Sequence, residues 1–158
     1  MRHAKSSWNH SGLTDHQRPL NQRGLRDAQR MGDLLNSEDL IPEIILSSTA
    51  ERAKLTIREL LKTCHFDGPL YYFDELYEAD IDDYIKCIHT LSANAQLVMM
   101  VGHNPEISSF LETICDSYEH MPTAAIAWVQ FRCEKWTDIP GTTGGKLVKL
   151  WTPKRLPH

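Results

Sequence analysis

The chain has 158 residues, of which 41% are hydrophobic and 24% charged, and this composition predicts one globular domain over residues 1–158. A formal charge of −4 argues against a surface for nucleic acid or anionic membrane, although 17 Lys and Arg residues leave room for a local cationic pocket. No apolar run approaches the ~20 residues needed to cross a bilayer, and we expect a cytoplasmic protein without a signal peptide.

The first half of the chain alternates between helical and extended patterns. The polar stretch 6–17 is typical of a loop, and Asn21 then suits the N-cap of a helix. Residues 43–46, after Pro42, predict a short buried strand. The two helices that flank this strand are marked by apolar residues at helical spacing, first Leu25, Ala28, Met31, Leu34 and Leu35, then Ala53, Ile57, Leu60, Leu61 and Cys64.

The middle of the chain repeats this alternation. Gly68-Pro69 predicts a turn into a strand at residues 70–73, and the apolar run 97–101 is typical of a central strand covered on both faces. Pro105 suits the start of a fourth helix. The third and fourth helices are marked by Ile81, Tyr84, Ile85, Ile88 and Leu91, and by Ile107, Phe110, Leu111 and Ile114.

The C-terminal part changes to a β pattern, with strands at 124–132 and 146–151 that predict a hairpin. The whole order predicts a three-layer α/β/α sandwich with a mostly parallel central sheet and a C-terminal β-hairpin. Ligands of such sheets gather at the carboxyl ends of the strands. Residues 47–52 and Gly102-His103 each follow a predicted strand, so we expect them at that edge.

The cationic and imidazole residues in or near the predicted loops suit phosphoryl chemistry. A phosphoryl group in transfer carries negative charge on three oxygens, and the planar fork of arginine can bind two of them at once. Arg2, Arg18 and Arg52 are the candidate cations. A neutral histidine can attack phosphorus and form a phosphohistidine intermediate. His3 is our candidate nucleophile, and His103 is a candidate donor to the phosphoryl oxygens.

Four segments, in order along the chain, resemble the motifs of the histidine phosphatase superfamily, and most of all its phosphohistidine phosphatase SixA branch. They are residues 2–6 (RHAKS), 18–24 (RPLNQRG), 47–53 (SSTAERA) and 101–105 (VGHNP). Residues 121–127 (MPTAAIA) are similar to the entry of that branch into its final hairpin. The resemblance covers nearly the whole chain.

The resemblance implies a role for each matched residue. His3 would be the phosphorylated nucleophile, and Arg2, Arg52 and His103 would complete the phosphate pocket. Arg18 and Asn104 would contact the substrate. Residues 76–79 (LYEA) resemble the segment that holds a proton-donating glutamate in many members, which makes Glu78 the candidate acid and Glu75 the alternative.

Leaving-group chemistry favours one substrate class. An alkoxide needs a proton donor to leave, whereas imidazole, with a conjugate-acid pKa of ~6.5, needs far less help. A compact site whose acid is not firmly assigned therefore favours a histidine-phosphorylated protein as partner, with inorganic phosphate as product. The resemblance implies a role in signal transduction, and we expect no cofactor or metal. The alternatives are a phosphatase for small phosphate monoesters and a non-catalytic phosphate- or phosphoprotein-binding module.

The resemblance also exposes a departure at the N-terminus. In the family an apolar strand runs directly into the Arg-His pair, whereas here only Met1 precedes Arg2. We expect this first strand to be missing from the chain as given, either because the start codon was set too late or because this is a damaged copy. His3 would then lie near a frayed terminus, close to a free amine.

Simpler interpretations apply to single residues. Arg52 could pair with Glu51 or Glu59 on a solvated helix face, and Glu78 lies in an acidic stretch that could be plain surface. The scattered cysteines are interpreted as small buried hydrophobes in a reducing compartment. The other residues interpreted without a functional role are His10, His16 and His120 as surface residues, and Trp8, Trp128, Trp136 and Trp151 as packing aromatics.

Overall fold

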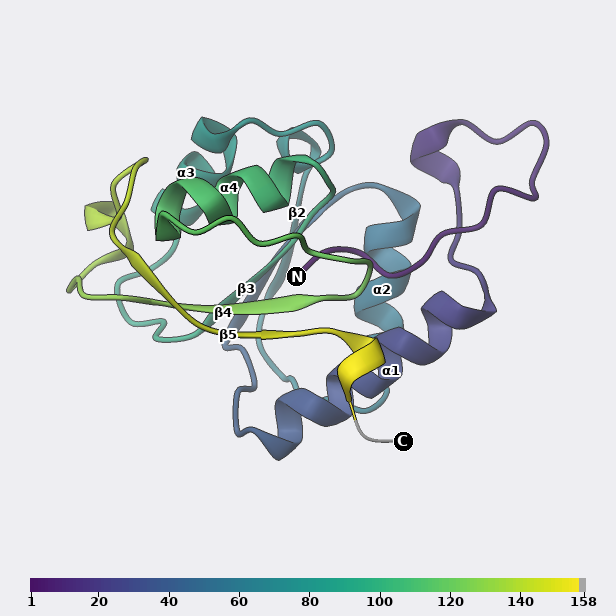
Figure 1. Cartoon of the computed structure of the whole chain (residues 1–158), viewed down its shortest axis with the longest axis horizontal. Coiled ribbons are helices and arrows are strands. Elements are labelled where there is room, and N and C mark those ends of the chain that lie inside the picture. The colour runs from purple at the N-terminus through teal and green to yellow at the C-terminus, as the bar shows by residue number, and fades with distance from the viewer. Residues whose placement is uncertain (157–158) are drawn as a thin grey trace.

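The computed structural model, which describes residues 1–156, contains a parallel sheet and a separate hairpin (Figure 1). The sheet has the strand order β2-β1-β3, with β1 (Ile44–Ser48), β2 (Leu70–Phe73) and β3 (Val98–Val101). The antiparallel hairpin consists of β4 (Ile126–Phe131) and β5 (Gly145–Trp151). The predicted α/β architecture with a C-terminal hairpin is therefore confirmed.

Helices cover both faces of this sheet. α1 (Gln22–Ser37) and α2 (Glu51–Leu60) pack together on one face, and α3 (Ile81–His89) and α4 (Glu106–Cys115) lie on the other (Figure 1). Each face has its own apolar core, and neighbouring residues of β1 alternate between the two: Ile45 belongs to the core under α1 and α2, and Leu46 to the core under α3 and α4. This alternation produces the three predicted layers.

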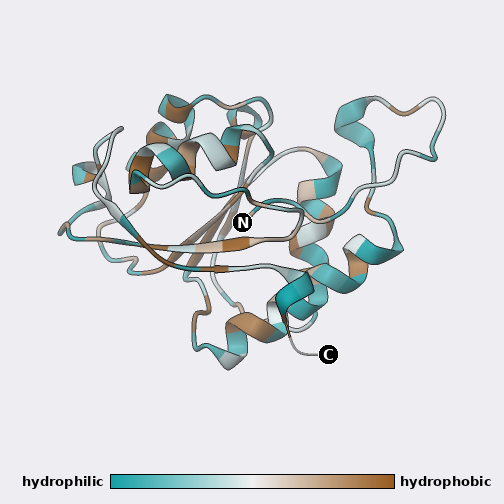
Figure 2. Ribbon diagram, viewed as in Figure 1, coloured by the Kyte–Doolittle hydropathy of each residue, from teal (hydrophilic) through white to brown (hydrophobic). Residues whose placement is uncertain are grey.

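Hydrophobic residues concentrate on the central strands and on the inward helix faces (Figure 2). The cysteine prediction holds for Cys64 and Cys87, which are buried free thiols, and is wrong for Cys133, which is exposed on the loop after β4. None of the helices within residues 1–156 is both long and apolar enough to span a membrane.

The predicted loop 6–17 contains a short 3₁₀ helix, Asp15–Gln17. Its first turn is closed by Thr14, whose backbone N–H donates to Gln17 Oε1 at 3.1 Å, while the Gln17 N–H donates to the Thr14 carbonyl. Further 3₁₀ turns at Asp74–Leu76, Trp136–Asp138 and Pro153–Arg155 lie in connections that the hydrophobic pattern does not mark. The turn at Asp15 is functionally relevant because it presents that carboxylate to the site described below.

The N-terminal residues lie between β3 and β4. Arg2 forms a parallel bridge with Gly102, and its N–H also donates to Ala125 O at 3.0 Å. Met1 and His3 are each only 6% exposed. The expected frayed terminus is therefore wrong, because backbone hydrogen bonds hold residues 1–3 from both sides.

Candidate active site

A cavity of about 410 Å³ lies at the carboxyl ends of β1 and β3, where the sequence places the ligand edge. Its lining includes every residue that we predicted for the site: Arg2, His3, Arg18, Arg52, Glu78, His103 and Asn104. Glu75, the alternative acid, is exposed and is not among the lining residues. Five separate segments of the chain therefore converge on one pocket.

His3 is held in one orientation by the backbone. The backbone N–H of His3 donates to Gly102 O at 3.0 Å, and its ring Nδ1 lies 2.7 Å from Ala4 O. A carbonyl can only accept, so Nδ1 carries the proton and Nε2 holds a lone pair. Burial lowers the pKa of His3 to about 3, and the positive charges of Arg52, Arg2 and Arg18 act in the same direction. His3 is therefore neutral at pH 7, with a free nitrogen lone pair.

His103 faces His3, with ring centroids 5.0 Å apart. Its Nε2 lies 2.8 Å from Ser48 Oγ, which also accepts the N–H of Ala50 at 3.2 Å. The hydroxyl hydrogen of Ser48 is then best used toward Nε2, which leaves the proton of His103 on Nδ1. Burial lowers the pKa of His103 to about 3, so this ring is also neutral and offers a donor.

Arg52, in the first turn of α2, is only 6% exposed. Its Nη1 donates to the backbone oxygen of Asp15 at 2.7 Å, and its Nη2 donates to Asp15 Oδ2 at 3.1 Å. The simpler interpretation, a surface pair with Glu51 or Glu59, does not fit this burial. Glu59 instead accepts from Lys62 and Gln29.

Asp15 collects two further donors. Arg18 Nε donates to Oδ1 at 3.0 Å, and the Tyr77 hydroxyl donates to Oδ2 at 2.6 Å. The hydrogen bond from Tyr77, with the charges of Arg52 and Arg18, lowers the pKa of Asp15 to about 2. The Tyr77 ring also stands edge-on to His103, with centroids 5.6 Å apart. The sequence analysis missed both Asp15 and Tyr77 as site residues.

Arg2 and Asn104 anchor the segment before the final hairpin. Arg2 Nη1 donates to Met121 O at 3.0 Å, and Asn104 Nδ2 donates to the same oxygen at 2.9 Å. Asn104 Oδ1 accepts the Ser108 hydroxyl at 2.8 Å. The Asn104 amide is thus engaged within the protein, which favours a role in shaping the pocket over a direct substrate contact.

Several buried donors of the pocket residues lack a partner among the described residues. They are Arg2 Nε, Arg18 Nη1, Arg52 Nε and His103 Nδ1. Buried donors without partners are costly, and such groups commonly mark a place where a ligand or water binds. Four of them around one neutral histidine make an environment suited to an oxyanion.

Two further features stand at the margin of the cavity. Trp8 is 74% exposed, and the Arg18 guanidinium lies 3.5 Å from its ring centroid, so its interpretation as a packing aromatic is wrong. His16, expected at the surface, is half-buried, with its ring edge-on to Tyr77. No group of three or more His, Cys, Asp or Glu residues within 1–156 is arranged to hold a metal ion.

The profile of the histidine phosphatase superfamily (branch 1) matches residues 1–99. An uncharacterized protein of Mycobacterium tuberculosis, Rv1276c, is 32% identical over 98% of this chain and 100% of its own length. An uncharacterized chloroplastic protein of Arabidopsis thaliana is 26% identical over 97% of this chain and 76% of its own length. The chain belongs to the histidine phosphatase superfamily, a membership that places it among phosphatase hydrolases.

Solved structures agree with this membership. A proposed phosphohistidine phosphatase SixA from Agrobacterium tumefaciens is 29% identical and superposes with a TM-score of 0.81, covering 97% of this chain and 95% of that one. A proposed SixA from Nakamurella multipartitia is 25% identical with a TM-score of 0.85, covering 97% and 93%. The protein histidine phosphatase SixA complexed with tungstate, at 22% identity and a TM-score of 0.85, shares the fold.

Proposed function

We propose that the chain is a phosphohistidine phosphatase that removes phosphate from histidine on another protein, with His3 as the nucleophile. The observation that supports this most directly is the free Nε2 lone pair of neutral His3, surrounded by buried donors without partners. The SixA-like neighbours support the same class.

The proposed reaction has two steps. Nε2 of His3 bonds to phosphorus as the P–N bond to the substrate imidazole breaks, and that imidazole leaves with a proton from solvent. Water then attacks the phosphoryl group on His3, which releases inorganic phosphate and restores the free lone pair. Arg2, Arg18, Arg52 and Nδ1 of His103 would balance the charge on the phosphoryl oxygens.

The pocket itself suits a leaving group that needs little acid. The Glu78 side chain is exposed, so the pocket does not enclose this candidate acid. Imidazole can leave without a strong acid to protonate it, whereas an alkoxide needs such an acid. The position of α4, which begins at Glu106 just after His103-Asn104, adds the positive end of a helix dipole near the bound anion.

One observation favours the second candidate, a phosphatase for small phosphate monoesters. Glu78 does line the cavity, where Glu75 does not, so a carboxyl group is within the pocket to protonate an alkoxide. Glu106, whose Oε2 is buried without a partner among the described residues, is another carboxyl group of the lining.

The deciding experiment compares phosphate release from a histidine-phosphorylated carrier protein and from p-nitrophenyl phosphate. We expect kcat/KM to be at least ~10-fold higher for the phosphoprotein, which corresponds to ~1.4 kcal/mol of transition-state stabilisation. A higher value for the monoester would select the second candidate. Tight phosphate binding with release from neither substrate would identify a binding module.

A further inference from the structure

Arg2 is held differently from the other arginines of the phosphate pocket. Arg18 and Arg52 each form an ion pair with the Asp15 carboxylate. Arg2 has no ion pair among the described residues, and its side chain donates from Nη1 to the backbone oxygen of Met121 at 3.0 Å. A neutral carbonyl orients a guanidinium without cancelling its charge, so Arg2 keeps a positive charge that no contacting carboxylate offsets.

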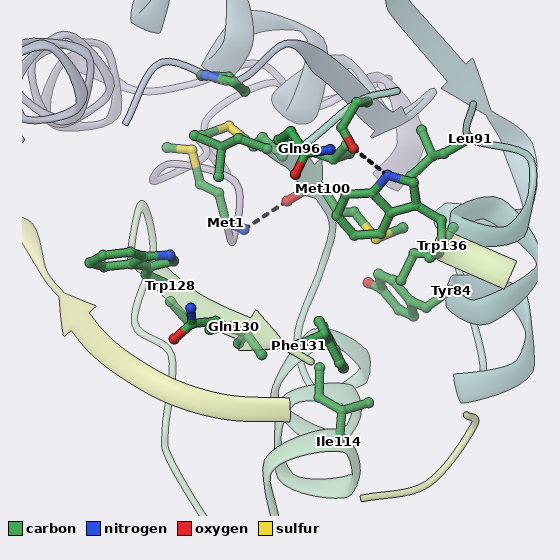
Figure 3. A pocket seen from close by; sticks show the side chains of 18 of the residues that line it. Met1, Tyr84, Leu91, Gln96, Met100, Ile114, Trp128, Gln130, Phe131 and Trp136 are labelled. Carbon is green, nitrogen blue, oxygen red and sulfur yellow. Dashed lines mark hydrogen bonds between the residues drawn. The ribbon is translucent and has the colours of Figure 1, made fainter. Parts of the chain in front are cut away.

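The Met121 carbonyl is not fixed by side-chain packing alone. Met121 is 1% exposed, and its side chain borders a second cavity, a space of about 520 Å³ that Tyr84, Trp128 and Phe131 also line (Figure 3). A side chain next to open volume lacks contact atoms on that side. The position of the Met121 backbone therefore depends on its hydrogen bonds.

Ser108 of α4 completes a ring of hydrogen bonds around this carbonyl. The Met121 N–H donates to Ser108 Oγ at 3.3 Å, and the Ser108 hydroxyl donates to Asn104 Oδ1 at 2.8 Å. Asn104 Nδ2 donates in turn to Met121 O at 2.9 Å, beside the bond from Arg2. The ring starts and ends at Met121, and both lone pairs of its carbonyl oxygen are used.

The Ser108 hydroxyl sets the direction of the bonds in this ring. Because its oxygen accepts from a backbone N–H, its hydrogen is free to point at Asn104, where only the amide oxygen can accept it. The amide nitrogen of Asn104 is thereby turned toward Met121 O. Without the hydroxyl the amide is free to rotate, and the carbonyl that holds Arg2 loses its fixed second donor.

The backbone around the candidate nucleophile is held independently of this ring. The N–H of Ala124 donates to His3 O at 3.0 Å, and Ala125 O accepts the N–H of Arg2 at 3.0 Å. Neither bond involves Ser108, whose side chain is half-buried. Loss of the Ser108 hydroxyl should therefore disturb the ring and leave the backbone beside His3 in place.

We propose that Ser108 is a positioning residue that aims Arg2 at the bound phosphoryl group. It acts through Asn104, whose amide holds the Met121 carbonyl in place. The buried Nε of Arg2, which has no partner among the described residues, is the donor that remains for the phosphoryl oxygens. The inference rests on the proposed function for its ligand, whereas the ring itself is present in the free protein.

The test is Ser108→Ala, with Ser109→Ala as the matched control. Ser109 is exposed on the same helix, and its hydroxyl has no hydrogen bond within the described residues. We expect Ser108→Ala to weaken binding of inorganic phosphate by ~5-fold and to lower kcat/KM for a histidine-phosphorylated carrier protein by ~10-fold, the scale of one hydrogen bond to a charged group. Ser109→Ala should stay within ~2-fold of wild type. Ser108→Thr, which keeps the hydroxyl, should recover most of the loss.

A double-mutant cycle separates positioning from a general loss of structure. In an Arg2→Lys chain, which lacks the guanidinium fork, adding Ser108→Ala should change phosphate binding and kcat/KM by less than ~2-fold. An equal loss with and without Arg2 would overturn the proposal, because Ser108 would then act by another route. Wild-type values in Ser108→Ala would overturn it as well.

An NMR measurement tests the ring without phosphate or turnover. In the free wild-type chain, the Nε–H of Arg2, identified by its loss in Arg2→Lys, should exchange with water at least ~5-fold more slowly than in Ser108→Ala, because a held guanidinium protects its donor. Equal exchange in the two chains would overturn the proposal. A wild-type chain that neither binds nor releases phosphate would contradict the proposed function instead, and the exchange rates would still decide whether Ser108 orders Arg2.

Discussion

The Asp15 carboxylate lies 3.1 Å from the Arg52 guanidinium, so an anion from the protein's own loop already contacts a cation of the proposed phosphate pocket. The same carboxylate bonds to Arg18, a second candidate phosphate ligand. A phosphoryl group entering the pocket must therefore share these arginines with Asp15 or displace it. We therefore expect the charge of Asp15 to lower the affinity of the pocket for anions.

Replacing Asp15 with asparagine tests that competition. Asp15→Asn removes one negative charge, while the bond from Arg52 Nη1 to the backbone oxygen of residue 15 is kept. We expect inorganic phosphate to inhibit or bind about 10-fold more tightly, with a smaller gain at high salt because the effect is electrostatic. Titration calorimetry at two salt concentrations measures this, with Asp33→Asn on the exposed face of α1 as control. Weaker phosphate binding would show instead that Asp15 is needed to position Arg52.

His3 is expected to carry the covalent phosphate. His3→Asn removes the lone pair at Nε2 and should lower turnover by at least ~1000-fold, while phosphate binding by the arginines persists. Rapid acid-free quenching followed by mass spectrometry should find phosphate on His3 of the wild-type chain. Residual activity above about a tenth of wild type would exclude His3 as the nucleophile.

The sequence could predict the fold and most of the pocket for identifiable reasons. Apolar periodicity reports which face of an element is buried, and Ile45 and Leu46 point to opposite cores as the strand pattern requires. Arg2, His3, Arg52 and His103 lie in segments that follow strands or match family motifs, so their convergence could be expected. All of them line the cavity.

The Asp15 network could not be predicted in the same way. Asp15 meets Arg52 across 37 residues and Tyr77 across 62, and the loop that carries it has no hydrophobic period to place it. Tyr77 was present in the segment compared with the family, but its neighbour Glu78 drew the functional interpretation. The buried terminus was missed for a different reason, because its stability comes from pairing with Gly102 and Ala125 and not from its own sequence.

Four groups whose pKa values are lowered in the folded chain predict how stability depends on pH. The pKa values of His3 and His103 are lowered to about 3, that of Asp15 to about 2, and that of the Met1 ammonium from 8.0 to about 5. In each window the unfolded chain binds a proton that the folded chain does not, so stability rises with pH from about 2 to 8.

Of these four groups, only the terminal amine still changes its protonation on unfolding above about pH 7, where the histidines of the unfolded chain are already neutral. Between pH 7 and 8 the free energy of unfolding should therefore continue to rise, by up to ~1.4 kcal/mol per pH unit. Urea denaturation at pH 5, 6, 7 and 8 measures the dependence, and acetylation of the Met1 amine should remove the part above pH 7. Stability that is flat or falls from pH 5 to 8 would contradict the burial of these groups.

The loss of hydrolysis rate on replacing Glu78 should grow with the basicity of the leaving group. Glu78→Gln keeps the shape of the side chain but removes its proton, so hydrolysis of an alkyl phosphate should fall by ~10²-fold or more, and hydrolysis of phosphohistidine by less than ~3-fold. Steady-state kinetics on both substrates measures the difference, with Glu75→Gln as the control outside the cavity lining. Equal losses on both substrates would remove the leaving-group argument for a phosphohistidine substrate.

Trp8 offers a test of whether the substrate is a protein. Its ring is exposed at the margin of the cavity and stacks on Arg18, so it can contact a macromolecular substrate beyond the phosphoryl group. Exposed aromatic residues of this kind are common anchors of protein interfaces, where truncation to alanine often costs about 1–2 kcal/mol of binding free energy, or ~5- to 30-fold in affinity.

Trp8→Ala should therefore raise KM for a histidine-phosphorylated carrier protein by about 10-fold and leave KM for p-nitrophenyl phosphate within ~2-fold. The control is Tyr118→Ala, which removes another exposed aromatic ring that is not part of the cavity lining. An equal rise in KM for both substrates would mean that Trp8 acts only by holding Arg18, and no change for either would remove Trp8 from the docking surface.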